Sequence, residues 1–260
     1  MKALGHWIVL KLRQGVRAFL RHLGFAYFRL VIRGTEQIPA SGPAILAGNH
    51  PNVLDGILLL IVSPRPVRFL VTEEMFFHPL LHWSFVLMDC IPVYRSRSHN
   101  GDALRAAVEA LERGDVIGIF PEGTTADRGR VREIRRGVGL LALKTGAPVV
   151  PFGVAGSYEL FPPERKVPRP GTIAMSFGRP QRLPVCSREV VPEAELTAAL
   201  GGIRSAILTE AASAEAVPAT FVPPWWKRLQ IAAASLLVVP MSGALTLTAP
   251  PNLEPAARHG

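Results

Sequence analysis

Short apolar runs alternate along the chain with longer segments in which apolar residues recur at helical spacing. The apolar runs predict strands at residues 44–48, 67–72, 90–94, 116–120, 149–154 and 172–177. The helical spacing predicts helices at residues 54–61, 103–113, 137–145 and 193–214, and a helical or buried segment at 80–88. Because strands alternate with helices, we expect an α/β fold with a mixed, largely parallel sheet flanked by helices.

Two glycines and a proline disturb these patterns. Gly201 and Gly202 mark a weak point in the helix expected at 193–214, because glycine is a poor helix former. Pro151 lies inside an expected strand, where its ring removes a backbone donor. A proline at such a position predicts an edge strand or a bulge.

The first 34 residues predict basic amphipathic helices at a membrane interface. Seven Lys and Arg residues and no acid precede Glu36, and apolar residues such as Trp7 and Phe19 fill the gaps. The segment holds no uninterrupted apolar stretch of about 20 residues, the length that a transmembrane helix needs, and no cleavage site of small residues. An ordinary domain helix with a solvated basic face is the alternative.

The last 43 residues predict a proline-broken linker and a hydrophobic tail at 218–260. Trp225, Trp226, Lys227 and Arg228 resemble an interface anchor, and a charge-free run follows at 229–253. That run is long enough to span a bilayer, but Pro240 and Gly243 equally favour a re-entrant or interfacial helix. The domain between these two segments is expected at 35–217.

Composition limits the classes of protein and partner. With 48% hydrophobic and 19% charged residues, the chain can bury a core. The formal net charge of +9 favours anionic partners: nucleic acid, an acidic membrane surface or a phosphorylated substrate. No nucleic-acid-binding motif is recognisable. Cys90 lies in an apolar run and is expected in the core. Cys186 is the other cysteine, and two isolated cysteines predict neither a disulfide framework nor a metal site.

The sequence NHPNVLD at residues 49–55 follows an expected strand. Pro51 disfavours helical geometry at His50 and suits the first turn of a helix. We therefore expect His50 at the strand-to-helix turn, where its ring folds back to the carboxylate of Asp55 in the helix behind it. Such a pair forms a general base, since the carboxylate orients the imidazole and stabilises the imidazolium.

The sequence FPEGTT at residues 120–125 follows another expected strand. Gly123 permits close approach of backbone amides, and these amides with the hydroxyls of Thr124 and Thr125 suit a phosphate or an oxyanion. Glu122 suits a hydroxyl or an arginine partner. Arg95, at the end of IPVYR, suits a bidentate phosphate contact.

These motifs resemble the blocks of the glycerolipid acyltransferase family, best known from 1-acylglycerol-3-phosphate acyltransferases. They occur in the family's order as NHPNVLD, IPVYR, FPEGTT and VVPFGV, and the likeness covers roughly residues 35–180. The resemblance implies His50 as the catalytic base and Asp55 as its partner. It implies substrate-binding roles for Asn49, Arg95, Glu122, Gly123, Thr124 and Pro151.

The resemblance also implies an acyl thioester donor, either acyl-CoA or an acyl-carrier protein, and no metal or other cofactor. Two cations common in the family are missing, because Thr125 replaces an arginine and VTEEMF at residues 71–76 has no lysine. The acceptor therefore stays open between lysophosphatidic acid, glycerol-3-phosphate and a lyso-aminolipid. Arginines left as possible replacements are Arg68, Arg97, Arg128, Arg130, Arg135 and Arg136.

The resulting hypothesis is an O-acyltransferase of phospholipid biosynthesis on the cytoplasmic face of the cell membrane. Its expected partners are membrane lipids and the acyl donor, with no nucleic acid. Two alternatives remain: a non-catalytic basic membrane-binding protein and a hydrolase that uses the same His–Asp pair on water. Trp83, Phe76 and Phe77 are expected in the core or along an acyl-chain groove.

Overall fold

The structure is a computed structural model that describes residues 2–94, 100–123 and 133–217. Its helices are α1 (Lys2–Tyr27), η1 (Thr35–Gln37), α2 (Asp55–Val62), α3 (Glu73–Phe76), α4 (His82–Leu87), α5 (Asn100–Glu112), α6 (Arg136–Thr145), α7 (Ser157–Leu160) and α8 (Glu193–Glu215). Its strands are β1 (Arg29–Arg33), β2 (Ala44–Gly48), β3 (Val67–Thr72), β4 (Ile91–Val93), β5 (Val116–Ile119), β6 (Val149–Ala155) and β7 (Thr172–Phe177).

The strands form one seven-stranded sheet in the order β1-β7-β6-β2-β5-β3-β4. The neighbours from β6 through β2, β5 and β3 to β4 pair in parallel. Strand β7 pairs antiparallel with β6 and parallel with β1. The predicted α/β fold with a mixed, largely parallel sheet is therefore confirmed.

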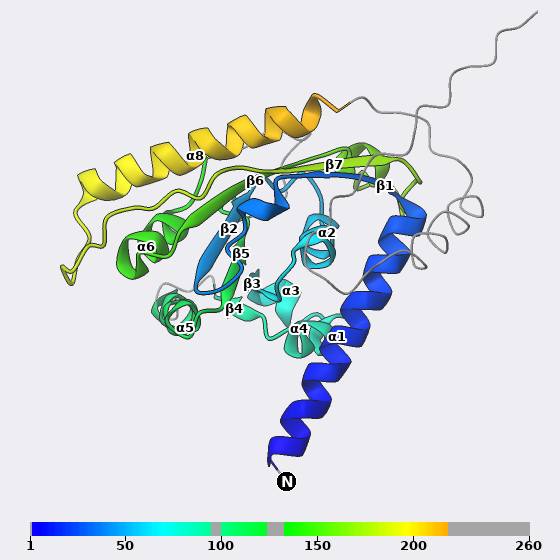
Figure 1. The fold of residues 1–260 in the computed structure, drawn as a ribbon, viewed down its shortest axis with the longest axis horizontal. Coiled ribbons are helices and arrows are strands. Elements are labelled where there is room, and N and C mark those ends of the chain that lie inside the picture. Colours follow the sequence, from blue (N-terminus) through cyan, green and yellow to red (C-terminus); the bar gives the residue numbers. More distant parts are fainter. Residues whose placement is uncertain (1, 95–99, 124–132, 218–260) are drawn as a thin grey trace, which may run out of the picture.

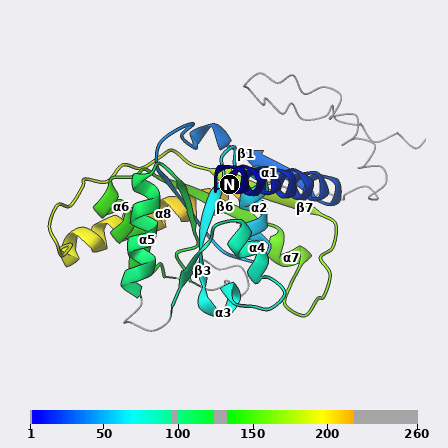
Figure 2. The same cartoon turned by 90° about the horizontal axis from the view of Figure 1, so that it is seen from below.

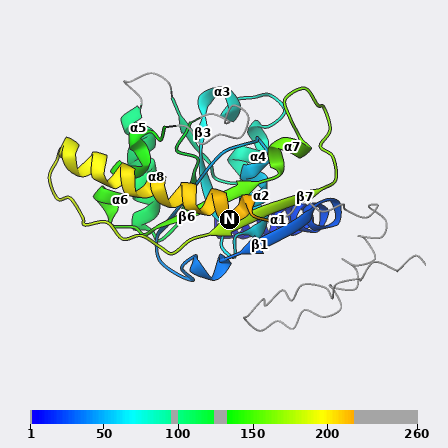
Figure 3. The ribbon, with the colours of Figure 1, turned by 90° about the horizontal axis from the view of Figure 1, so that it is seen from above.

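Helices cover both faces of this sheet (Figure 1). On one face, α1 and α2 pack together and share a core with side chains such as Leu46, Val150 and Phe152 (Figure 2). On the other face, α5, α6 and α8 bury Ile45, Val149 and their neighbours. Helix α8 lies across the sheet over β6 (Figure 3). The alternation of inward side chains along each strand supplies both cores.

Residues 29–33 differ from the helix that the sequence predicted for the first 34 residues. They form β1, which pairs with β7 from Arg29 opposite Thr172 to Arg33 opposite Ser176. Apolar residues occupy the middle of this strand and arginines its exposed ends. The preceding basic segment is one continuous helix, α1.

Helix α8 continues through the glycines that were expected to weaken it. Gly201 and Gly202 are both exposed, and a Cβ added to either would meet no atom within 4 Å. The helix is held instead by its buried face, where Leu196, Ile203 and Ile207 are fully buried. Tertiary packing thus outweighs the low helix propensity of the glycine pair.

Pro151 lies in a central strand, so the edge-strand alternative was wrong. On one side it is opposite Ala47 of β2. On the other side the regular pairing with β7 begins only at Phe152 opposite Phe177, and an isolated bridge joins Val149 to Gln181. One extra residue lies on the partner strand between these two pairs, which is a bulge. The proline is tolerated because its missing N–H faces this interruption.

The segment between β3 and β4 is more exposed than a core segment would be. Phe76 is buried, but Phe77 and Trp83 are 54% and 62% exposed, and Leu80 is 76% exposed. Of the two alternatives for these aromatic residues, the core is therefore confirmed for Phe76 and wrong for Phe77 and Trp83, and the acyl-chain groove stays a prediction.

In the part of the chain that the structure describes, no helix is both long enough and apolar enough to cross a membrane.

Candidate active site

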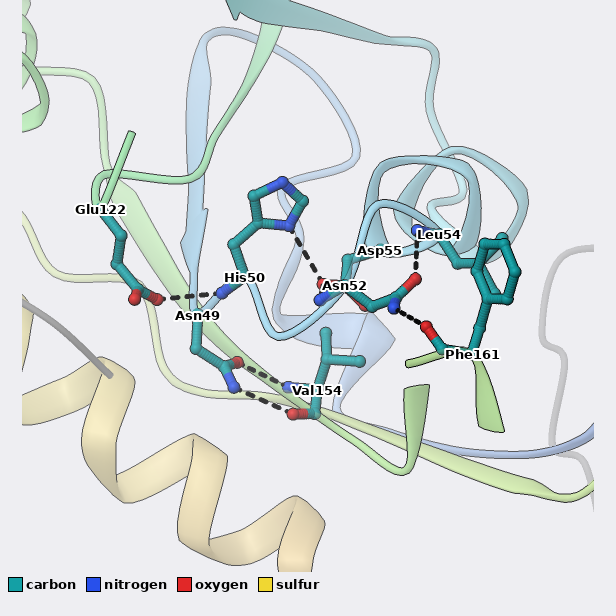
Figure 4. Close-up of polar contacts among 8 residues, drawn as sticks. All are labelled: Asn49, His50, Asn52, Leu54, Asp55, Glu122, Val154 and Phe161. Atoms are coloured by element: carbon teal, nitrogen blue, oxygen red, sulfur yellow. Dashed lines mark hydrogen bonds and ion pairs between the residues drawn. The ribbon is translucent and has the colours of Figure 1, made fainter. Parts of the chain in front are cut away.

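The candidate site lies at the carboxyl ends of three adjacent parallel strands. Strand β2 lies between β5 and β6, and the three strands end at Gly48, Ile119 and Ala155. The NHPNVLD and FPEG sequences follow two of them directly. The carboxyl ends of parallel strands are a common place for ligand sites in α/β sheets, because several loops converge there. Figure 4 shows how these loops meet.

His50 and Asp55 form the hydrogen-bonded pair that the sequence predicted. The Nδ1 atom of His50 lies 3.0 Å from Oδ2 of Asp55, and Asp55 is fully buried as the first residue of α2. The other ring nitrogen of His50 points away from the carboxylate (Figure 4). The imidazole is stacked on Phe120 with 4.0 Å between ring centroids. An imidazole oriented in this way can act as a general base through Nε2.

Asp55 is held in an apolar site by a few polar contacts. Burial raises the pKa of its carboxyl above the ordinary value, because desolvation disfavours the charged form. Contacts with His50, Ser157 and the backbone of Asn52 oppose that rise and lower the pKa. The Asn52 N–H donates to Oδ2 at 2.6 Å. The same carboxylate oxygen therefore serves both the imidazole and the loop.

The amide of Asn49 joins the loop after β2 to strand β6. Its Nδ2 donates to the Val154 carbonyl at 2.9 Å, and its Oδ1 accepts from the Val154 N–H at 2.7 Å. Asn49 is buried. The resemblance implied a substrate-binding role for this residue, but the structure engages its amide with the backbone. It fixes the start of the loop that carries His50.

Glu122 also acts on that loop. Its Oε1 accepts a hydrogen bond from the backbone N–H of His50 at 3.0 Å, and the residue is only 4% exposed. The resemblance implied that Glu122 binds the acceptor. The observed contact instead ties the loop after β5 to the loop after β2, beside the imidazole (Figure 4).

Gly123 completes the turn after β5. Its N–H donates to the Phe120 carbonyl at 3.0 Å, so this amide is already engaged within the turn. Its φ of 71° is a conformation that favours glycine, and a Cβ there would lie 2.3 Å from Nε of Arg135. The close approach that the glycine permits is therefore made by the Arg135 side chain. Thr124 and Arg95 lie outside the described residues.

Pro151 does not lie with His50. Its neighbours Val150 and Phe152 face the α2 side of the sheet, and Pro151 faces α8. There it lines an open hollow of about 640 Å³ with Arg179, Pro180, Gln181, Gly202, Ser205, Ala206, Thr209 and Glu210. The structure therefore separates this predicted substrate-binding residue from the His–Asp pair by the thickness of the sheet.

Three of the arginines that the sequence left as replacement cations can be placed. Arg68 bonds to Asp115 at 2.9 Å and pairs with Asp89 at 3.2 Å. Arg136 makes two hydrogen bonds to Glu193, at 2.7 and 3.0 Å. Arg135 is exposed and lies against the FPEG turn. The remaining candidates, Arg97, Arg128 and Arg130, lie outside the described residues.

Sequence reasoning missed three residues of the site. Asn52 donates through its side chain to the Phe161 carbonyl and accepts from the Leu54 N–H. Phe120 supports the imidazole, and Ser157 contacts Asp55. Asn52 and Phe120 stand inside the recognised motifs, and of the two only Phe120 is an unusual choice for a solvated loop. Ser157 lies beyond the last motif, and no local pattern indicates it.

The described part of the chain brings together no group of three or more His, Cys, Asp or Glu side chains suited to a metal ion. The side chains gathered around the site are the His–Asp pair, Asn49, Glu122 and, at the turn after β5, Arg135.

Comparison with known proteins gives consistent results. Residues 29–155 match the family model described as Acyltransferase. The chain is 30% identical over 140 residues to a chloroplastic 1-acyl-sn-glycerol-3-phosphate acyltransferase of Arabidopsis thaliana, covering 53% of this chain and 39% of that protein. It is 28% identical over 140 residues to a 1-acyl-sn-glycerol-3-phosphate acyltransferase of Borreliella burgdorferi, covering 54% of this chain and 56% of that protein. The chain thus spans about two fifths to just over half of the length of these curated relatives.

A solved structure extends the likeness beyond the motifs. The 1-acyl-sn-glycerophosphate acyltransferase PlsC of Thermotoga maritima superposes with a TM-score of 0.64 and 25% sequence identity, covering 81% of this chain and 84% of that one. The match to the family model includes the loops that carry His50, Asp55 and Glu122. Residues 29–155 therefore form an acyltransferase domain of the glycerolipid acyltransferase family.

Proposed function

We propose that this protein transfers a fatty-acyl group from an acyl thioester, acyl-CoA or acyl-carrier protein, to a hydroxyl of a lysophospholipid or glycerol-phosphate acceptor. The first candidate acceptor is 1-acylglycerol-3-phosphate, which the names of the relatives from Arabidopsis thaliana and Borreliella burgdorferi contain. The observation that carries the proposal is the buried Asp55 carboxylate 3.0 Å from Nδ1 of His50. This contact leaves Nε2 free to act as the base.

The reaction follows from that geometry. Nε2 of His50 takes the proton from the acceptor hydroxyl, and the resulting alkoxide attacks the carbonyl carbon of the thioester. The new C–O bond forms an anionic tetrahedral intermediate. Its collapse breaks the C–S bond, and the proton passes from the imidazolium to the departing thiolate. Asp55 stabilises the imidazolium throughout, and Glu122 and Asn49 hold the loop.

No acyl-enzyme is required. Cys90 lies partly buried directly before β4, and burial raises the pKa of its thiol to about 11. At neutral pH this thiol is therefore protonated and is a poor nucleophile.

The first candidate acceptor is a lipid, so the protein would work at a membrane, and we place it on the cytoplasmic face of the cell membrane. Residues 7–12 of α1 are all exposed, including Trp7 and Leu12. Lys11 adds a cation, and each cation near anionic lipid contributes about 1 kcal/mol. Arg17 is engaged with the protein instead, because it donates to the Leu60 and Ser63 carbonyls at the end of α2.

The exposed α3–α4 segment extends the membrane-facing surface proposed for α1. Arg13 of α1 lies 3.9 Å from Asp89, directly after α4, so the middle of α1 and the end of α4 are neighbours. Phe77, Leu80 and Trp83, which precede Asp89 in the α3–α4 segment, are exposed. An aromatic and apolar surface next to a basic helix is typical of a protein that lies on a bilayer.

The experiment is an acceptor panel with a labelled acyl-CoA and the purified protein in detergent. His50→Ala should lower transfer by about 10²–10⁴-fold, the usual loss for a general base. His22→Ala is the matched control, because His22 is an exposed histidine of α1. Transfer by His50→Ala within threefold of wild type would contradict the mechanism. Release of free fatty acid without transfer to any acceptor would favour the hydrolase.

A further inference from the structure

Ser157 is a fully buried polar residue next to the proposed catalytic pair. It is the first residue of α7 and follows β6, the strand that receives the Asn49 amide. Among the described residues, its Oγ has no hydrogen-bond partner. The same holds for Oδ1 of Asp55. Two buried polar atoms without partners are costly, and such a pair calls for a functional explanation.

The chain holds Ser157 beside Asp55 from both ends of α7. At one end, Gly156 has a φ of 88°, and a Cβ there would lie 2.4 Å from the Thr172 carbonyl oxygen. At the other end, the Asn52 amide donates to the Phe161 carbonyl, and the Phe161 N–H donates to the Ser157 carbonyl at 3.0 Å. The loop that carries Asp55 is therefore fastened to the turn that carries Ser157.

The two oxygens of Asp55 have different surroundings. Oδ2 is engaged twice, by His50 Nδ1 at 3.0 Å and by the Asn52 N–H at 2.6 Å. Oδ1 is left for a donor on its other side. The Ser157 hydroxyl lies near enough to this carboxylate to lower its pKa, which agrees with a donor in that place.

We propose that Ser157 is a positioning residue whose hydroxyl donates to Oδ1 of Asp55 and thereby fixes the carboxylate with Oδ2 toward His50. The inference rests on the proposed function, since it assigns Ser157 to the same general base. Catalytic hydrogen bonds are often long or poorly aligned in a free enzyme and tighten in the substrate complex. The two unpartnered oxygens, Oγ of Ser157 and Oδ1 of Asp55, fit that behaviour. Complete burial rules Ser157 out as an acyl-accepting nucleophile.

The test is a double-mutant cycle between residues 157 and 55, read as kcat and acceptor KM. Ser157→Ala should lower kcat about tenfold, the effect of losing one hydrogen bond to a charged group, and leave the acceptor KM unchanged. In the Asp55→Asn background, Ser157→Ala should lower kcat by less than about twofold. The side-chain amide of the Asp55→Asn variant cannot stabilise the imidazolium, so fixing the orientation of that amide contributes little to kcat.

Ser176→Ala is the matched control. Ser176 is also buried, but its hydroxyl donates to Glu210 on the α8 face of the sheet. The Tm of Ser176→Ala and that of Ser157→Ala are both measured by thermal unfolding. Of the two variants, only Ser157→Ala should lower kcat. Ser157→Cys keeps the shape of the side chain and offers a weaker donor, so its kcat should fall between those of wild type and Ser157→Ala.

A kcat for Ser157→Ala within twofold of wild type would overturn the inference. So would an equal loss of kcat from Ser157→Ala in the wild-type and the Asp55→Asn backgrounds. If Ser157→Ala does not fold, a wild-type kcat for Ser157→Cys would overturn it. The His50→Ala variant separates this failure from a failure of the proposed function. If His50→Ala loses transfer and Ser157→Ala does not, only the role of Ser157 is wrong.

Discussion

Glu122 and His50 are 72 residues apart in the chain, and Oε1 of Glu122 accepts the backbone N–H of His50 at 3.0 Å. The contact places a buried carboxylate behind the base. It joins the loops after two adjacent parallel strands, β2 and β5. Glu122 is therefore positioned to hold the imidazole in place, a different role from the acceptor binding that the family resemblance implies.

This contact predicts the kinetic signature of Glu122 variants. Glu122→Ala should lower kcat about tenfold with little change in acceptor KM, because the loss of one charge-assisted hydrogen bond loosens His50. Glu122→Gln keeps an accepting oxygen and should recover part of kcat. Steady-state kinetics with the preferred acceptor measure both. A rise in acceptor KM at constant kcat would show that Glu122 binds the acceptor after all.

Asp55→Asn should lose activity yet change stability in a pH-dependent way. Burial raises the pKa of the Asp55 carboxyl, so the folded protein binds this proton more tightly than the unfolded chain does. Wild-type stability therefore falls as pH rises from the ordinary aspartate pKa through the raised one. Asparagine does not titrate and escapes that loss.

The Tm of Asp55→Asn relative to wild type should consequently rise with pH, and the difference should be smallest near the ordinary aspartate pKa of about 4. Thermal unfolding of both proteins across the range from about pH 4 to about pH 8 gives the measurement. A Tm difference that stays constant with pH would mean that Asp55 is not the desolvated carboxylate that the structure indicates. Transfer activity should be lost at every pH, because the amide cannot stabilise the imidazolium.

Arg135 and Arg136 offer a matched pair for acceptor recognition. Arg135 lies against Gly123, and Arg136 is engaged by Glu193. If Arg135 supplies a cation to the acceptor phosphate, Arg135→Ala should raise the KM for a phosphate-bearing acceptor about tenfold. Arg136→Ala should change this KM by less than twofold, because Glu193 already engages the Arg136 guanidinium with two hydrogen bonds.

The discriminating measurement uses a second acceptor, a monoacylglycerol, which has no phosphate. Arg135→Ala should leave its KM unchanged and thus reduce the preference for the phosphorylated acceptor. Equal effects of Arg135→Ala on the two acceptors would place the phosphate elsewhere.

The exposed α3–α4 segment predicts a role on vesicles and none in free solution. Replacing Leu80 and Trp83 together with serine should weaken binding to anionic vesicles and slow acylation of a vesicle-embedded acceptor, because less apolar surface is buried in the bilayer. Activity on a short-chain, water-soluble acceptor should be unchanged. Vesicle sedimentation and parallel kinetics provide the readouts. Val190→Ser is the control, because Val190 is equally exposed but precedes α8.

If the double variant sediments with vesicles as wild type does, the α3–α4 segment does not contact the membrane. The tail at 218–260, which the sequence predicts as a second membrane element, lies outside the described residues. Removing it tests that prediction separately, since binding that depends only on α1 should be released by high salt.

Local pattern was sufficient for most of the secondary structure and for the central pair. The strands at 44–48, 67–72 and 172–177 begin and end where the apolar runs do. These runs are bounded by glycine, proline and polar residues, which commonly end a strand. His50 and Asp55 are close in the chain, so Pro51 and the helix start were enough to predict that the two side chains meet. No partner from elsewhere had to be known.

Tertiary structure decided everything that depends on which segments become neighbours. Residues 29–33 form a strand because β7 is available to pair with them, and α8 stays helical through two glycines because the sheet beneath it buries Ile203 and Ile207. Pro151 faces α8 because α8 packs over the face of β6 opposite to Val150 and Phe152. The supports of the His–Asp pair, Glu122 and Ser157, arrive from loops after β5 and β6. Their positions follow from the strand order β5-β2-β6, a long-range property that local periodicity and turn chemistry do not encode.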